Sequence, residues 1–121
     1  MHHDQCRRTA LIVEDEALIR ADIADALRGA GWHVFESASA ERAIELLKEQ
    51  NFSVVFTDIQ LQGRLTGWDV AEACRTSRPG MVVIYTSGNV ADRARSVEGS
   101  RFFDKPYRVA DILEACTVDG A

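Results

Sequence analysis

The sequence has few of the features that mark secreted, membrane-spanning or nucleic-acid-binding proteins. Its three cysteines lie far apart and form no CxxC pair, which argues against a disulfide framework or a structural zinc site and indicates a reducing compartment. No apolar run approaches the ~18 residues of a membrane-spanning helix, and the N-terminus is polar. The formal net charge of −5 argues against nucleic-acid binding, which usually uses a basic patch. We therefore expect a cytoplasmic protein that binds neither a membrane nor nucleic acid directly.

The chain is long enough for one hydrophobic core. Its 121 residues, 46% of them hydrophobic, match the size and composition of a single globular domain. No repeat, linker or low-complexity stretch divides it. We predict one domain over residues 1–121, with a polar tail at 1–8, a core at 9–117 and a second tail at 118–121.

Short β-type runs and helical patterns alternate along the whole chain. Runs of apolar and β-branched residues predict strands at residues 9–13, 32–35, 52–57, 81–85 and 101–104. Helical spacing of apolar residues predicts helices at residues 17–28, 40–50, 67–75, 90–98 and 109–116. This alternation predicts an α/β fold in which helices cover both faces of a parallel sheet.

Polar residues stand where the predicted strands end. Glu14 and Asp15 follow the first strand, Asp58 the third, Thr86 the fourth and Lys105 the fifth. Ligands of open parallel sheets bind beyond the carboxyl ends of the strands. We therefore expect these five side chains to converge on one rim of the sheet.

The expected carboxylates need a cation among them. Two carboxylates ~4 Å apart at an effective dielectric of ~20 repel by about 4 kcal/mol, and an all-oxygen site suits a hard ion such as Mg²⁺. We predict that Glu14, Asp15 and Asp58 hold Mg²⁺ together with the backbone carbonyl of Gln60.

The same rim has the residue types of a phosphoryl-transfer site. Asp58 is the candidate nucleophile, since a carboxylate can attack a phosphoryl group to give an acyl phosphate. The Thr86 hydroxyl and the Lys105 ammonium can each contact a phosphoryl oxygen. Only two of the fourteen basic residues are lysines, so a lysine at a strand end is less readily explained as general surface charge.

Each of these residues also has an ordinary structural interpretation. Glu14 and Asp15 match the acidic start of a helix, and Asp58 matches a turn former after a strand. Thr86 suits a strand-to-loop transition, and Lys105 followed by proline suits a turn. Only their joint order at successive strand ends favours a shared site.

Five segments of the chain together form a specific pattern: Leu11–Glu16, Val54–Asp58, Gly67, Val83–Gly88 and Phe102–Pro106. In these segments the chain resembles the receiver domains of bacterial two-component response regulators. The resemblance covers about residues 10–115. It implies a flavodoxin-like (βα)5 three-layer sandwich with a central five-stranded parallel sheet of order 2-1-3-4-5.

The resemblance implies a Mg²⁺-dependent phosphotransfer. A sensor histidine kinase or a histidine phosphotransfer protein would phosphorylate Asp58, with Lys105 and Thr86 assisting. Asp15 would bind the metal directly and Glu14 partly through water. The chain would not be an enzyme beyond catalysing its own phosphorylation and dephosphorylation.

The resemblance also implies a conformational switch. Thr86 would move toward the phosphoryl group, and Phe102 would turn into the space that it leaves. This movement would alter a surface for an unknown output protein, in a monomer or in a phosphorylation-dependent homodimer. The bond between Lys105 and Pro106 is expected to be cis.

The sequence departs from the family pattern at three places. Gln62 replaces a frequent proline, and the loop of residues 59–66 is about one residue longer than usual. Only nineteen positions separate Thr86 from Lys105, a few fewer than is typical. We therefore predict that the helix at residues 90–98, the fourth of the family fold, is short or frayed, because nine residues make a marginal helix.

Other functions remain open from the sequence. An aspartate-nucleophile phosphohydrolase of the haloacid-dehalogenase type usually has a second Asp where this chain has Gln60. A flavodoxin-like cofactor module needs a phosphate-binding first loop, but residues 14–16 are acidic. A pseudo-receiver that never accepts phosphate is a further alternative. The receiver would be a separate protein or a part cut from a larger one.

Overall fold

Strands and helices alternate through the described part of the chain. The computed structural model describes residues 8–87 and 99–120, with side chains as far as Cys116. Residues 1–7 of the predicted tail and the helix predicted at residues 90–98 lie outside the described residues. The elements are β1 (Thr9–Val13), α1 (Ala17–Gly29), β2 (His33–Ser37), α2 (Ala40–Glu49), β3 (Val54–Asp58), α3 (Gly67–Ser77), β4 (Val82–Ser87), β5 (Arg101–Asp104) and α4 (Val109–Gly120).

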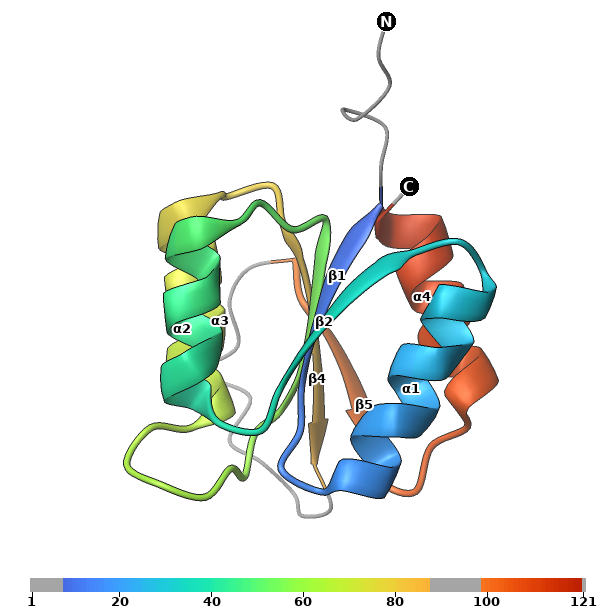
Figure 1. Cartoon of the computed structure of the whole chain (residues 1–121), viewed down its shortest axis with the longest axis horizontal. Helices are drawn as coiled ribbons and strands as arrows, with labels where there is room; N and C mark the ends of the chain where they lie inside the picture. The colour runs from blue at the N-terminus through green and yellow to red at the C-terminus, as the bar shows by residue number, and fades with distance from the viewer. Residues whose placement is uncertain (1–7, 88–98, 121) are drawn as a thin grey trace, which may run out of the picture.

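The five strands form one sheet in the order β2-β1-β3-β4-β5, and every neighbouring pair is parallel. This order and the flavodoxin-like α/β architecture confirm the prediction. In Figure 1, α2 and α3 cover one face of the sheet, and α1 and α4 cover the other. The carboxyl ends of the strands therefore meet at a single edge, the lower one in that view.

Two apolar layers fill the space between the sheet and its helices. Alternate residues of β3 point to opposite layers, with Val55 facing α2 and α3 and Phe56 facing α1 and α4. All five residues of β3 are buried, as expected for a central strand covered on both faces. The edge strands β2 and β5 are each only partly buried. Asp58 thus ends a strand that is buried along its whole length.

Side chains define where the helices begin. The Ser39 hydroxyl accepts a hydrogen bond from the Arg42 amide at 3.2 Å and thereby caps α2. The Asp69 carboxylate accepts a bond from the Thr66 amide at 2.7 Å at the start of α3. This contact satisfies a backbone donor that the helix itself leaves without a partner.

Some predicted boundaries were wrong. The second strand ends at Ser37 instead of Phe35, because all of its residues pair in register with β1. The third strand is Val54–Asp58, so Phe52 is buried but precedes the strand. Helix α4 continues to Gly120 through residues that were predicted to form a tail.

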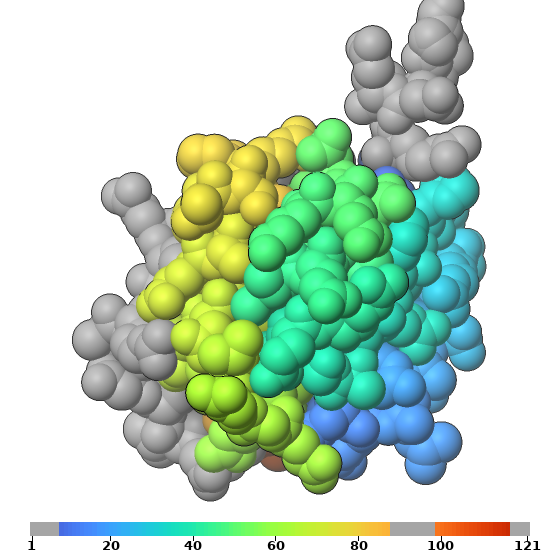
Figure 2. Space-filling model, turned by 60° about the vertical axis from the view of Figure 1, so that its left-hand side comes forward, coloured from blue at the N-terminus to red at the C-terminus, as the bar shows by residue number. Residues whose placement is uncertain are grey.

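Helices α2 and α3 pack side by side on one face of the molecule (Figure 2). The loop of residues 59–66 runs along the lower edge of this view, below both helices. Gly63 in this loop has a φ of 108°, which a residue with a side chain rarely adopts.

None of the described helices has both the length and the apolar character that crossing a membrane requires.

Candidate functional site

The carboxyl edge of the sheet brings together residues from four different strand ends. Glu14 directly follows β1, Asp58 is the last residue of β3, and Lys105 directly follows β5. Thr86 lies in β4 as the register partner of Asp58. The sequence places these residues up to 91 positions apart, so the parallel topology alone makes them neighbours.

Three carboxylates share this edge. One oxygen each from Glu14, Asp15 and Asp58 lies within 4.8 Å of the others. Lys105 Nζ donates to Asp58 Oδ2 at 2.7 Å and to Glu14 Oε1 at 3.5 Å. A single ammonium group therefore partly offsets the charge of two carboxylates.

Backbone amides hold the remaining carboxylate oxygens. The Glu16 amide donates to Glu14 Oε2 at 3.1 Å, and the Gln60 amide donates to Asp58 Oδ1 at 3.0 Å. The Gln62 amide donates to Asp15 Oδ2 at 3.3 Å. Gln60 thus adjoins the cluster, while the role predicted for its carbonyl as a metal ligand stays a prediction.

Burial changes the acidity of the cluster. Glu14 is fully buried, and this burial, with the nearby charge of Asp58, raises the pKa of its carboxyl to about 7 despite the opposing Glu16 amide and Lys105. Burial acts to lower the pKa of Lys105, but the Asp58 and Glu14 carboxylates outweigh it and raise that pKa above its ordinary value. The ammonium therefore remains charged at neutral pH.

The donor set fits a hard divalent cation. All three side chains offer carboxylate oxygens, which Mg²⁺ prefers. Asp15 is partly exposed, whereas Glu14 and Asp58 are buried, so the cluster is open to solvent on the side of Asp15. A metal ion here would add the positive charge that three carboxylates and one lysine leave uncompensated.

The hydroxyl of Thr86 is buried and has no hydrogen-bond partner among the described residues. Buried hydroxyl groups are normally paired, because leaving one unpaired costs free energy. Thr86 stands directly beside Asp58 in the sheet. Its hydroxyl is therefore free to donate to an oxygen-rich group bound at Asp58.

Helix α3 begins in direct contact with the backbone of Asp58. The Gly67 amide donates to the carbonyl of Ile59 at 2.9 Å. A Cβ at residue 67 would lie 2.7 Å from the Cα of Ile59 and closer still to the carbonyl oxygen of Asp58. Only glycine allows this approach, which is the physical reason for a glycine nine residues after the aspartate.

Phe102 lies beside the cluster instead of within it. It is the register partner of Tyr85 in the sheet, and the two ring centroids are 6.2 Å apart. Tyr85 in turn contacts Trp68, with ring centroids 4.7 Å apart. Phe102 is thus the partly buried end of an aromatic row that passes next to Thr86.

Two residues near the site were missed by the sequence analysis. Tyr107 follows the cis peptide bond between Lys105 and Pro106, which was expected, and its ring contacts Phe56 at a centroid distance of 6.0 Å. Arg20 Nη1 in α1 donates to the carbonyl oxygen of Glu14 at 2.8 Å. No sequence motif pointed to either residue, because one contact is between rings and the other is to a backbone carbonyl.

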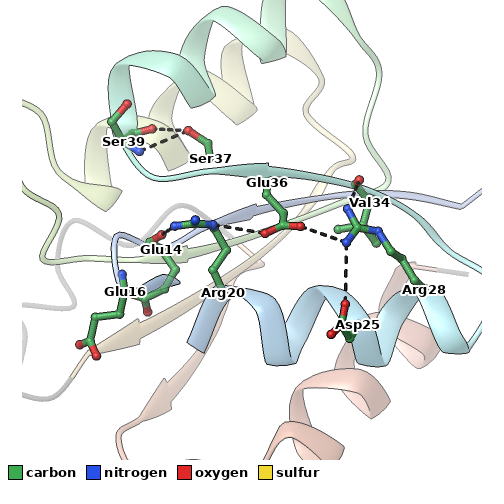
Figure 3. Close-up of polar contacts among 9 residues, drawn as sticks. All are labelled: Glu14, Glu16, Arg20, Asp25, Arg28, Val34, Glu36, Ser37 and Ser39. Carbon is green, nitrogen blue, oxygen red and sulfur yellow. Dashed lines mark hydrogen bonds and ion pairs between the residues drawn. The ribbon is translucent and has the colours of Figure 1, made fainter. Parts of the chain in front are cut away.

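Arg20 belongs to a polar network between α1 and β2 (Figure 3). Its Nε donates to Glu36 Oε1 at 3.3 Å, and Arg28 Nη1 donates to Glu36 Oε2 at 3.0 Å. Arg28 also donates to the Val34 carbonyl at 3.0 Å. The carbonyl of Glu14 is therefore linked through Arg20 to Glu36 of the edge strand, and Arg28 holds the other oxygen of Glu36.

Comparison with known proteins identifies related chains. A family model described as the response regulator receiver domain matches residues 10–117. The chain is 31% identical over 112 residues to transcriptional regulatory protein PdtaR of Mycobacterium tuberculosis, covering 89% of this chain and 54% of that protein. It is 33% identical over 122 residues to two-component response regulator ORR6 of Oryza sativa, covering 93% and 71%.

A solved structure agrees with these relatives. The crystal structure of a response regulator receiver protein from Sinorhizobium medicae superposes with a TM-score of 0.90 at 32% identity, and the match covers 94% of each chain. The chain spans about half the length of the first curated relatives, 54% of PdtaR and 46% of TcrX from the same organism.

Proposed function

The chain belongs to the receiver domain family of two-component response regulators, and on that premise we propose that Asp58 accepts a phosphoryl group from a phosphohistidine. The reaction would depend on Mg²⁺ and would switch a protein-interaction surface. The observation that carries this proposal is the position of Asp58 between two further carboxylates and Lys105, beside a buried Thr86 hydroxyl without a described partner.

The proposed transfer needs only groups at this edge of the sheet. A carboxylate oxygen of Asp58 attacks phosphorus and forms a P–O bond. The P–N bond to the donor imidazole breaks, and its electron pair goes to the imidazole nitrogen. Lys105, 2.7 Å from Asp58 Oδ2, orients the carboxylate and attracts a phosphoryl oxygen. Thr86 donates its unpaired hydroxyl to another phosphoryl oxygen.

The metal would be held by Glu14, Asp15 and Asp58, with the Gln60 carbonyl as a further ligand. Bound Mg²⁺ supplies positive charge for the phosphoryl oxygens. The short distances among the three carboxylates support this assignment. Both carboxylate oxygens of Glu14 already accept hydrogen bonds, from the Glu16 amide and from Lys105, so we assign Glu14 a contact partly through water and the more exposed Asp15 a direct one.

The switch would follow from the new bond of Thr86. Phosphorylation adds ~2 negative charges and strong acceptor oxygens, so the hydroxyl is drawn toward Asp58. Phe102, which is only partly buried, would then turn inward along the row that it forms with Tyr85. Phosphorylation would thereby shift an equilibrium between two surfaces.

The partner that donates phosphate would dock over α1. Leu18 in α1 is the one large apolar side chain among the described residues that is largely exposed, at 82%. The same helix borders a cavity of about 430 Å³, which is lined by Ile19, Asp22, Lys105, Pro106, Tyr107 and Val109. This apolar surface reaches Lys105, so a helix that carries the phosphohistidine can lie on α1 and face Asp58.

Intact-mass spectrometry after treatment with acetyl phosphate tests the proposed acceptor. We expect a gain of about 80 Da that requires Mg²⁺, is lost at alkaline pH and is absent in Asp58→Asn. Asp25→Asn on α1, whose side chain is 78% exposed, is the matched control and should gain the same mass. An adduct that persists in Asp58→Asn would refute Asp58 as the acceptor.

The same purified protein distinguishes the alternative functions. Steady hydrolysis of phosphate esters would favour a phosphohydrolase, and a chain that accepts phosphate neither from acetyl phosphate nor from a phosphorylated histidine kinase would be a pseudo-receiver.

To test the docking surface, Leu18→Asp should slow transfer from the kinase but not from acetyl phosphate. Lys48→Asp on α2 should change neither rate. We propose that the domain over residues 9–117 performs these steps in the cytoplasm.

A further inference from the structure

Arg20 touches the acidic cluster without belonging to it. It lies in the first turns of α1, and its Nη1 donates to the carbonyl oxygen of Glu14 at 2.8 Å. This carbonyl belongs to the peptide that joins Glu14 to Asp15, two of the three clustered carboxylates. The orientation of that peptide sets the position of the Asp15 Cα, and with it the direction of the Asp15 side chain.

The guanidinium group is itself held in place. Its Nε donates to Glu36 Oε1 at 3.3 Å, and only 20% of the Arg20 side chain is exposed. Arg28 occupies the other oxygen of Glu36 at 3.0 Å and also binds the Val34 carbonyl. Figure 3 shows Arg20 between Glu14 and Glu36, as a bridge from the cluster to the edge strand.

Every polar group of Glu14 has a hydrogen-bond partner. Its amide donates to the Ser37 carbonyl at 3.0 Å, its carbonyl accepts from Arg20, and its carboxylate accepts from the Glu16 amide and Lys105. The amide and carbonyl contacts both depend on β2, directly or through Glu36. The edge strand thus clamps the backbone at the point where β1 turns into α1.

We propose that Arg20 is a positioning residue for the metal site: it holds the peptide between Glu14 and Asp15 so that both carboxylates face Asp58. This inference rests on the proposed function, since it concerns the same Mg²⁺ ligands. It adds a residue that touches neither metal nor phosphate, together with Glu36 and Arg28 as its supports.

Positioning and charge predict opposite effects, which makes the proposal testable. If Arg20 acted only through its positive charge, removing it would strengthen the binding of a dication. If Arg20 positions the ligands, removing it weakens that binding. Lysine keeps the charge, but its single ammonium group lacks the planar fork that reaches the Glu14 carbonyl and Glu36 together.

The experiment is a Mg²⁺ titration by isothermal calorimetry of the unphosphorylated wild type, Arg20→Gln, Arg20→Lys and the matched control Arg42→Gln. Arg42 forms a similar surface pair with Glu45 on α2. We expect both Arg20 variants to bind Mg²⁺ about 10-fold more weakly, at the lower end of losses for residues that support metal ligands. Arg42→Gln should match the wild type.

A second readout needs no metal. The Gln62 amide donates to Asp15 from a different loop, so its amide NMR signal reports where the Asp15 carboxylate lies. We expect this signal to shift in both Arg20 variants and to stay in place in Arg42→Gln. Circular dichroism shows whether each variant is folded. If Arg20→Gln does not fold, Arg20→Lys alone tests the proposal.

The outcomes separate this inference from the proposed function. Unchanged or tighter Mg²⁺ binding by folded Arg20→Lys, with an unmoved Gln62 signal, would overturn the positioning role alone. The same weakening in Arg42→Gln would overturn it as well, because the effect would then come from any surface arginine. A wild type that binds no Mg²⁺ would overturn the proposed metal site and this inference with it.

Discussion

At both ends of the sheet an arginine donates to a backbone carbonyl, but the two ends differ in the carboxylates that they gather. At the amino end, Arg78 donates to the Phe52 carbonyl at 3.2 Å, and Arg75 donates to the Met81 carbonyl. At the carboxyl end, Arg20 donates to the Glu14 carbonyl at 2.8 Å. Only the carboxyl end, within the described residues, gathers three carboxylates in one place.

The difference teaches how stability and function are divided in this fold. At the amino end, Arg75 and Arg78 donate to backbone carbonyls. The carboxyl end buries Glu14 and Asp58 near each other and leaves the Thr86 hydroxyl without a described partner. Both features cost free energy in the absence of a ligand, which fits the proposal that this end binds metal and phosphate.

The largest contrast should come from two glycines, one at each end. We predict that Gly67→Ala destabilises the protein by about 3 kcal/mol, because its Cβ would meet the backbone of Asp58 and Ile59. Gly80→Ala, before β4, should change stability by less than about 0.5 kcal/mol, because its Cβ meets nothing within 4 Å. Urea unfolding measures both, and equal losses would contradict the contrast.

Removing a buried charge should stabilise the carboxyl end. Burial raises the pKa of Glu14 to about 7 from an ordinary value of 4.5, so its ionisation costs stability progressively as pH rises through this interval. Without Mg²⁺ at pH 8, we predict that Glu14→Gln is more stable than the wild type by about 1–2 kcal/mol.

This gain should shrink at pH 5, where Glu14 is largely protonated in the folded protein. Thermal unfolding at the two pH values gives the comparison, and the same variant should bind Mg²⁺ more weakly. A loss of stability at pH 8 would show that Glu14 supports the fold instead of opposing it.

At the amino end, removing a charged side chain should lower stability instead of raising it. Arg78→Met leaves the Phe52 carbonyl without its guanidinium donor, so we predict a loss of about 1 kcal/mol in the free energy of unfolding. The yield of aspartyl phosphate from acetyl phosphate should not change, because Arg78 lies at the far edge of the sheet. A fall in that yield in the folded variant would mean that the two ends are coupled.

The smallest effect concerns Cys74 in α3, which is fully buried. Burial raises the pKa of its thiol to about 12, although the charge of Arg75 opposes the shift. The thiolate that reacts is therefore almost absent at pH 8. We predict no labelling of Cys74 by iodoacetamide in the native protein and full labelling in guanidinium chloride, as read by peptide mass spectrometry. Native labelling would reveal opening beneath α3.

Much of the fold followed from local patterns in the sequence. The first and fifth strands have the predicted bounds, residues 9–13 and 101–104, because each is short and bounded by polar or turn residues. The edge strand β2 was misjudged because Glu36 and Ser37 are polar, and only pairing with β1 makes them part of a strand. Its exposure to solvent hides the pattern that marks a buried strand.

The site was predictable to the extent that it depends on strand ends. Asp58 and Lys105 were found because the carboxyl ends of parallel strands converge, and they lie 2.7 Å apart. Arg20 was not found, because its bond to the Glu14 carbonyl depends on the angle at which α1 leaves the sheet. Tyr107 was not found either, since a ring that packs on Phe56 has no distinguishing sequence pattern.

The aromatic row gives the protein a built-in optical reporter. Of the two tryptophans, Trp68 packs against Tyr85, the neighbour of Thr86, in the layer under α2 and α3. Trp32 lies in the opposite layer, before β2 and at the other end of the sheet. Light emitted by Trp68 therefore senses movement beside Asp58, while Trp32 contributes a steady background. A Trp32→Phe variant would leave Trp68 as the single fluorescent tryptophan with which to follow the proposed switch.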